Sequence, residues 1–116
     1  MSKETEKQKE ERGKAIQKAF KTAASVPLET ARTCEKILDV ALVVAQKGNK
    51  SSISDAAVSA LMAKAGIQSA VLNVKTNLVS VKDEDFIKKI SKELEYLLEN
   101  AEKKTREVME IVEKDL

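Results

Sequence analysis

The sequence predicts an all-α protein built as a bundle of about four long helices. Only 3% of the residues are aromatic, and the chain has three Gly and one Pro, so β-favouring residues and turn formers are scarce. Charged residues make up 34% of the chain, and most are Lys and Glu, which are good helix formers. Apolar residues recur in steps of three and four, as on a helix with one buried face. The 116 residues suit a single domain, 1–116.

The first half of the chain predicts helices at about 4–25 and 28–47, which are either separate or one helix kinked at Pro27. Residues 1–14 are charged, with both signs at helical spacing, and form a solvated helix start or a frayed tail. Gly48, directly after Lys47, is a helix C-cap signal. The expected core face consists of Ala15, Ile16, Ala19, Phe20, Ala23, Leu28, Ala31, Cys34, Leu38, Ala41 and Ala45.

A third helix is expected at about 54–78, with Ser54 and Asp55 as its N-cap pair. Residues 51–81 carry few charges and many small side chains, so we expect this helix to be buried on nearly every side. The other helices have one-sided apolar faces and can cover only part of it. A second copy of the chain, or helices missing from the N-terminal side, would then complete the bundle, and we expect a homodimer at least.

The last helix is expected at about 83–114, where acidic residues at 83–85 lie at its positive end. Its predicted core face consists of Ile87, Ile90, Leu94, Leu97, Ala101, Val108 and Val112, with Leu98 and Ile111 beside it.

Composition argues against several classes of function. With no His, the chain has no imidazole for acid–base catalysis or metal binding, and its single Cys34 cannot form an intrachain disulfide. We interpret Cys34 as a small core residue. No uninterrupted apolar run reaches about 18 residues and the N-terminus lacks a signal-peptide core, so we expect no membrane span and a cytoplasmic location. The net charge of +2 and the few aromatics do not favour nucleic-acid binding.

One face of the weakly charged third helix is polar and small. Its members follow helical steps: Asp55, Ser59, Met62, Gly66, Ser69, Asn73, Thr76 and Asn77. One interpretation is close helix packing through Gly66 and the alanines, with Ser and Asn bonding across helices. The other is a ligand groove in which Asp55 is the acid and Asn73 and Asn77 are orienting amides. Asp55 as a helix cap alone is the rival role for that residue.

Several short motifs occur together at characteristic spacing. They are Val26-Pro27-Leu28-Glu29, Lys47-Gly48-Asn49, Ser54-Asp55, Leu72-Asn73-Val74 with Asn77-Leu78, and Lys82-Asp83-Glu84 with Phe86. In this combination the chain resembles the cyclodeaminase/cyclohydrolase family of folate enzymes. The resemblance covers roughly residues 3–114. Family members carry a Gly-rich segment upstream, which this sequence lacks, so the chain resembles only the C-terminal portion of the family.

The resemblance implies an all-helical, dimeric enzyme acting on one-carbon tetrahydrofolates without a metal or redox cofactor. Cyclodeaminases convert 5-formimino-tetrahydrofolate to 5,10-methenyl-tetrahydrofolate and ammonia, and cyclohydrolases open the methenyl bridge with water. Both reactions move protons, and Asp55 is the one carboxylate in a weakly charged segment, so we assign it as the catalytic acid/base.

The substrate-binding residues expected with it are Asn49, Ser54, Asn73, Lys75 and Asn77. Lys64 is an alternative to Lys75 for the anionic folate tail. A non-catalytic helical dimerisation module remains the alternative function, since it explains the apolar faces equally well.

Overall fold

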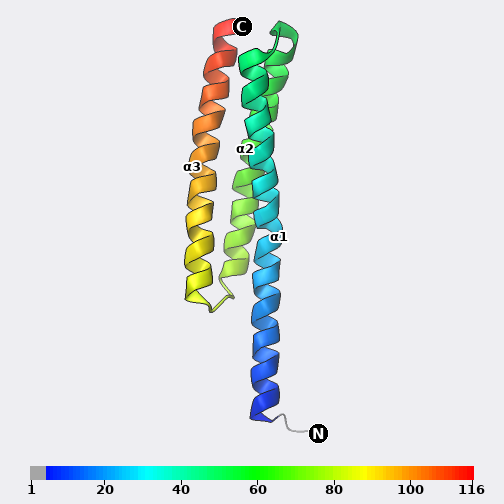
Figure 1. The fold of residues 1–116 in the computed structure, drawn as a ribbon, viewed down its shortest axis with the longest axis vertical. Helices are drawn as coiled ribbons and strands as arrows, with labels where there is room; N and C mark the ends of the chain where they lie inside the picture. The colour runs from blue at the N-terminus through cyan, green and yellow to red at the C-terminus, as the bar shows by residue number, and fades with distance from the viewer. Residues whose placement is uncertain (1–4) are drawn as a thin grey trace.

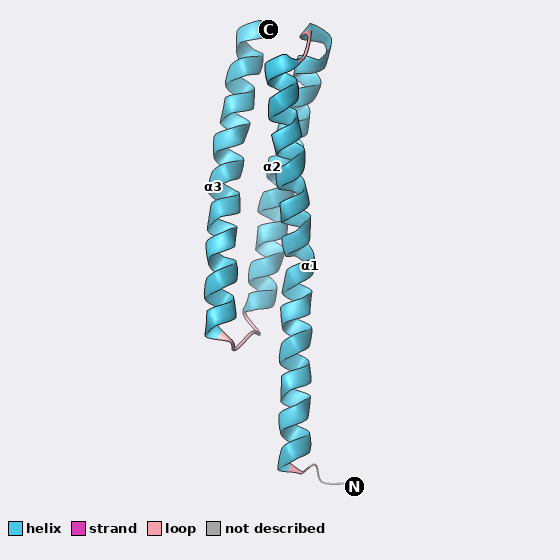
Figure 2. Cartoon of the chain, in the orientation of Figure 1, coloured by secondary structure: helices cyan, strands magenta, loops and turns pink. Residues whose placement is uncertain are grey.

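The computed structural model describes residues 5–116, which form three α-helices joined by short loops (Figures 1 and 2). α1 spans Glu6–Lys47, α2 spans Lys50–Leu78 and α3 spans Glu84–Asp115. α1 and α3 run in the same direction and α2 runs antiparallel to both (Figure 1). The bundle measures 71 × 23 × 16 Å, because the N-terminal end of α1 extends well past the other two helices.

α1 is one continuous helix with Pro27 inside it, so the alternative of a single helix through Pro27 is confirmed and the alternative of separate helices at 4–25 and 28–47 is wrong. Thr5 caps it: the Thr5 hydroxyl accepts a hydrogen bond from the Gln8 N–H, and the Gln8 side chain accepts one from the Thr5 N–H. Residues 6–14 are helical and exposed, whereas the predicted start at residue 4 lies outside the described residues.

Small side chains let α1 and α2 approach closely. A Cβ added to Gly66 of α2 would lie 2.7 Å from the Cys34 Sγ of α1, so this contact requires glycine. Cys34 is half-buried against the core, as its interpretation as a small core residue predicts. The core alanines of the two helices are Ala24, Ala31, Ala41, Ala45, Ala56, Ala57, Ala60, Ala63 and Ala70.

α3 covers one side of the α1–α2 pair with a single apolar face. Ile90, Leu94, Leu97, Ala101, Val108 and Val112 are buried, which confirms these predicted core positions. Ile87, Leu98 and Ile111 are partly buried beside them. Thr105 is also buried in this face, and its Oγ1 has no hydrogen-bond partner among the described residues.

The expected core positions at the start of α1 are not buried. Ala15 and Ala19 are exposed, and Ile16 keeps 46% of its surface accessible. For Ala15 and Ile16 the physical reason is the length of α1, because the start of the helix extends beyond the ends of α2 and α3 (Figure 1). Ala19 lies between Gln17 and Lys21, which contact the loop before α3, but its own side of the helix is left uncovered. An apolar face read from sequence shows which side of a helix can be buried, but the partner must also reach it.

α2 is only half covered, which corrects the prediction that it is buried on nearly every side. Val58, Leu61, Met62 and Leu72 are 55%, 48%, 70% and 65% exposed. The other two helices therefore cover one side of α2, and the opposite side presents apolar residues to the surroundings. This agrees with the expectation that the chain's own helices cannot enclose it.

α2 is also long and apolar enough to cross a membrane, by length and composition only, and 39% of the relevant window is buried inside the bundle. A core helix of a water-soluble protein passes the same test, so this observation is weak evidence. The expectation of no membrane span was based on uninterrupted apolar runs, whereas α2 reaches the required mean hydropathy with a few charged residues inside it.

Candidate functional site

Asp55 lies in a groove of about 240 Å³ between α1 and α2. It is the one ionisable side chain among the residues that line this groove, which we call the Asp55 groove. The lining residues are Ile37, Val40, Ala41, Val44, Ser52, Asp55, Ala56 and Ser59. Val40 is 62% exposed, so the groove opens onto the surface that the chain's own helices leave uncovered.

Asp55 and Ser54 do not cap α2, which corrects the predicted start of this helix. The helix begins four residues earlier, at Lys50, and Asn49 is its N-cap. The Asn49 Oδ1 accepts hydrogen bonds from the backbone N–H groups of Ser51 and Ser52, at 3.1 and 3.2 Å. Asp55 therefore lies in the second turn of the helix, so its side chain does not act as the helix cap.

The short loop before α2 depends on Gly48, the predicted C-cap of α1. A Cβ there would collide with the Val44 carbonyl oxygen and the Ser52 Oγ. The tight connection brings Asn49 and the exposed Ser54 to the same end of the bundle as Asp55. The structure thus groups three of the predicted site residues at one end.

The other predicted residues lie at the opposite end of α2. Asn73 and Lys75 are exposed and Asn77 is half-buried. Eighteen residues separate Asp55 from Asn73, a distance of about 27 Å along a helix that rises about 1.5 Å per residue. Within one chain the two groups therefore form separate surfaces.

Asn77 has a structural partner that the sequence pattern did not suggest. Pro27 has no N–H, so the Ala23 carbonyl, four residues earlier, loses its helical donor. The Asn77 Nδ2 donates to this carbonyl at 3.3 Å and to the Asn73 carbonyl at 3.0 Å. An amide from α2 thus replaces the hydrogen bond that Pro27 removes from α1.

The sequence pattern of a family described as formiminotransferase-cyclodeaminase matches residues 1–96, most of the chain. The chain belongs to the formiminotransferase-cyclodeaminase family. The match includes Asn49 and all of α2, and therefore every predicted site residue.

Relatives within the formiminotransferase-cyclodeaminase family carry two different names. The chain is 46% identical over 101 residues to a methenyltetrahydrofolate cyclohydrolase of Methylorubrum extorquens, covering 87% of this chain and 49% of that protein. It is 37% identical over 98 residues to a formimidoyltransferase-cyclodeaminase of Dictyostelium discoideum, covering 84% of this chain and 18% of that protein.

A formimidoyltransferase-cyclodeaminase of Gallus gallus is 32% identical over 114 residues, covering 98% of this chain and 21% of that protein. The chain thus spans about half the length of the cyclohydrolase and about a fifth of the two cyclodeaminases.

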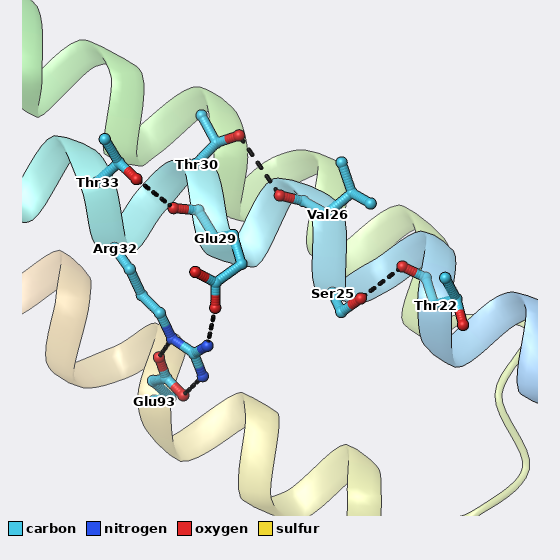
Figure 3. A network of polar contacts seen from close by, with 8 residues as sticks. All are labelled: Thr22, Ser25, Val26, Glu29, Thr30, Arg32, Thr33 and Glu93. Carbon is cyan, nitrogen blue, oxygen red and sulfur yellow. Dashed lines mark hydrogen bonds and ion pairs between the residues drawn. The ribbon is translucent and has the colours of Figure 1, made fainter.

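In this family member, polar contacts between α1 and α3 fix how the two parallel helices align. The Arg32 guanidinium donates through Nε and Nη2 to both carboxylate oxygens of Glu93, at 2.5 and 2.6 Å, and also pairs with Glu29 (Figure 3). The hydrogen bond from Arg32 lowers the pKa of Glu93, although partial burial opposes this shift. The same bond raises the pKa of Arg32.

Further contacts continue this alignment along the bundle. Asn100 donates to Glu35 at 2.8 Å, and Lys104 pairs with Asp39, which raises the pKa of Lys104. Sequence reasoning missed these pairs. The available signal was the recurring offset, since the paired residues in α1 and α3 are 61 to 65 positions apart.

The two lysines considered for the folate tail differ in their surroundings. Lys64 pairs with Glu102 of α3 at 2.8 Å, so its charge is already balanced. Lys75 is exposed near the C-terminal end of α2. Among residues 5–116, no three Cys, Asp or Glu side chains converge in a way that could hold a metal ion.

Proposed function

We propose that this chain forms about half of a methenyltetrahydrofolate cyclohydrolase, which hydrolyses the methenyl bridge of the folate to a formyl group. The observation that carries the proposal is the 46% identity, over 87% of the chain, to a protein with that name. Neither a metal nor a redox cofactor is part of the proposal.

The Asp55 groove supports hydrolytic chemistry. Opening a methenyl bridge requires removal of a proton from the attacking water, and a carboxylate in a groove can accept it. Asp55 has no ion-pair partner within the described part of the chain, and helix capping does not occupy it. Its side chain is therefore available for a proton.

The remainder of the site is proposed to come from outside these three helices. The Asp55 groove opens beside exposed apolar residues, among them Val40 and Val58, so a covering element would bury apolar surface and close the groove together. We propose that a second copy of the chain supplies this cover. An antiparallel arrangement of two α2 helices would bring Asp55 of one copy toward Asn73 and Lys75 of the other.

The cyclodeaminase reaction is the second candidate, because the Dictyostelium and Gallus relatives carry that name. Ammonia must leave as a protonated species, so the same carboxylate would act as an acid. The two reactions differ in substrate. Both can be followed by the absorbance of methenyl-tetrahydrofolate, which decays in the hydrolase reaction and forms in the deaminase reaction.

The test is a chimera in which this chain replaces the matching half of the Methylorubrum cyclohydrolase. We expect the chimera to consume methenyl-tetrahydrofolate, and Asp55→Asn to lower turnover by about 10²- to 10⁴-fold with no loss of folding. Asp85→Asn, an exposed aspartate outside the groove, is the matched control and should leave turnover unchanged.

Turnover of the Asp55→Asn chimera at the parental rate would contradict the catalytic role of Asp55. A chimera that forms methenyl-tetrahydrofolate from the formimino substrate but does not consume it would favour the deaminase.

A further inference from the structure

A second groove lies at the opposite end of the bundle from Asp55, where α1 extends past the loop between α2 and α3. It has a volume of about 640 Å³ and is lined by four lysines and one carboxylate among other residues. We call it the lysine groove. The lining residues are Glu10, Gly13, Lys14, Ile16, Gln17, Lys18, Lys21 and Lys82.

The lysines come from two separate parts of the chain. Lys14, Lys18 and Lys21 follow steps of four and three along α1, so they share one helix face. Lys82 comes from the loop before α3. Of the four, Lys21 is balanced, since it pairs with Asp83 at 2.7 Å and lies 5.2 Å from the centre of the Phe86 ring. The other three have no acidic partner within residues 5–116.

Gln17 holds the two parts together. Its Nε2 donates to the Ser80 carbonyl at 3.2 Å, and its Oε1 accepts from the Lys82 N–H at 2.8 Å. These two bonds attach the loop to α1 and keep Lys82 beside the helix. These contacts add the charge of Lys82 to the charges of the lysines on α1. Like charges four residues apart on one helix face destabilise the helix when nothing offsets them.

Gly13 is a second, independent feature of this groove. A glycine inside a helix makes the helix less stable than an alanine would. A Cβ at Gly13 would meet no atom within 4 Å, so packing within the chain does not require glycine at this position. Its effect in the structure is to leave the groove wall open. The exposed Ile16 beside it gives the groove an apolar surface.

We propose that the lysine groove binds a small multivalent anion, a molecule that carries two or more carboxylate or phosphate groups. Lys14, Lys18 and Lys82 would contact the anionic groups, and Gly13 would admit the body of the ligand. Glu10 lies at the edge of the groove and opposes binding. This inference does not depend on the proposed folate activity.

The test is titration calorimetry on the 116-residue chain at low salt with two probes, tri-γ-glutamate and inorganic tripolyphosphate. We expect at least one probe to bind, and Lys14→Gln/Lys18→Gln to weaken binding about tenfold or more. The matched control is Lys36→Gln/Lys92→Gln, which removes the same charge from exposed lysines outside the groove. The tighter probe identifies a carboxylate or a phosphate ligand.

Gly13→Leu separates a ligand held in the groove from a loosely attracted counterion. It leaves the net charge unchanged and fills the open wall, so it should weaken binding while circular dichroism shows the helix intact. Glu10→Gln should strengthen binding. The proposal is overturned if neither probe binds, if the control pair weakens binding as much as the groove pair, or if Gly13→Leu binds like the parent.

Discussion

α2 and α3 contribute about equal lengths to the bundle, but the outer faces of the two helices differ in polarity. α3 buries one apolar face, and its other face is mostly charged. α2 buries an alanine-rich face against α1 and presents Val58, Leu61, Met62 and Leu72 on the outside. An outer apolar face adds little to the stability of a lone bundle, so α3 is accounted for by the fold of the single chain, whereas the outer face of α2 is not and is the interface we propose.

The largest expected effect tests the two helices directly. Leu94→Ala in α3 removes a fully buried side chain and should lower the free energy of unfolding by about 2–5 kcal/mol. Leu72→Ala, the same substitution at an exposed position of α2, should change the free energy of unfolding of the monomer by less than about 0.5 kcal/mol. Urea denaturation at concentrations low enough to keep the chain monomeric measures both, and equal losses would show that the chain's own helices cover the face carrying Leu72.

A smaller effect is expected where α2 supports α1 at Pro27. Asn77→Ala should lower the free energy of unfolding by about 1 kcal/mol more in the parent than in the Pro27→Ala background. The reason is that alanine at position 27 again supplies an N–H to the Ala23 carbonyl. A double-mutant cycle by urea denaturation measures this coupling, with the exposed Asn73→Ala as the control. Identical costs in the two backgrounds would show that the amide does not replace the missing donor.

The smallest effect is the pH dependence of the α1–α3 ion pair. Arg32 lowers the pKa of Glu93 below its ordinary value of 4.5, so the folded state binds this proton less readily than the unfolded state. The stabilisation is therefore complete above pH 4.5 and is lost as the pH falls through the lowered pKa.

Glu93→Gln should thus lower the free energy of unfolding by up to about 1 kcal/mol at pH 7, and the difference from the parent should shrink below pH 4.5. Glu95→Gln, an exposed neighbour, serves as the control and should show no such dependence. A difference from the parent that does not change with pH would contradict the role of this pair.

Local patterns predicted α3 almost completely, because its charged and apolar faces are cleanly separated. Local patterns failed where the burial of a residue or the start of a helix depended on other residues nearby in the fold. Ile16 has the right periodicity but no helix beside it, and the start of α2 moved to Lys50 because Asn49 caps as well as Ser54 would. Thr105 is buried in the same face of α3, at a position that the list of predicted core residues did not include.

The candidate site was predictable in part. The position of Asp55 in a groove follows from the weakly charged segment, but the groove itself depends on how α1 and α2 cross, which no local pattern encodes. The role of Asn77 depends on Pro27, fifty positions away in sequence, and the two groups of predicted residues lie at opposite ends of one helix. Their assignment to a single substrate site stays a prediction.

Sedimentation velocity of the 116-residue chain at micromolar concentration tests most directly whether the outer face of α2 is an interface. We expect a dimer or larger assembly, and a shift toward monomer when Leu72→Lys places a charge in that face with the helical content unchanged. A parent chain that already sediments as a clean monomer at these concentrations, or an assembly that Leu72→Lys leaves unchanged, would contradict an interface on this face.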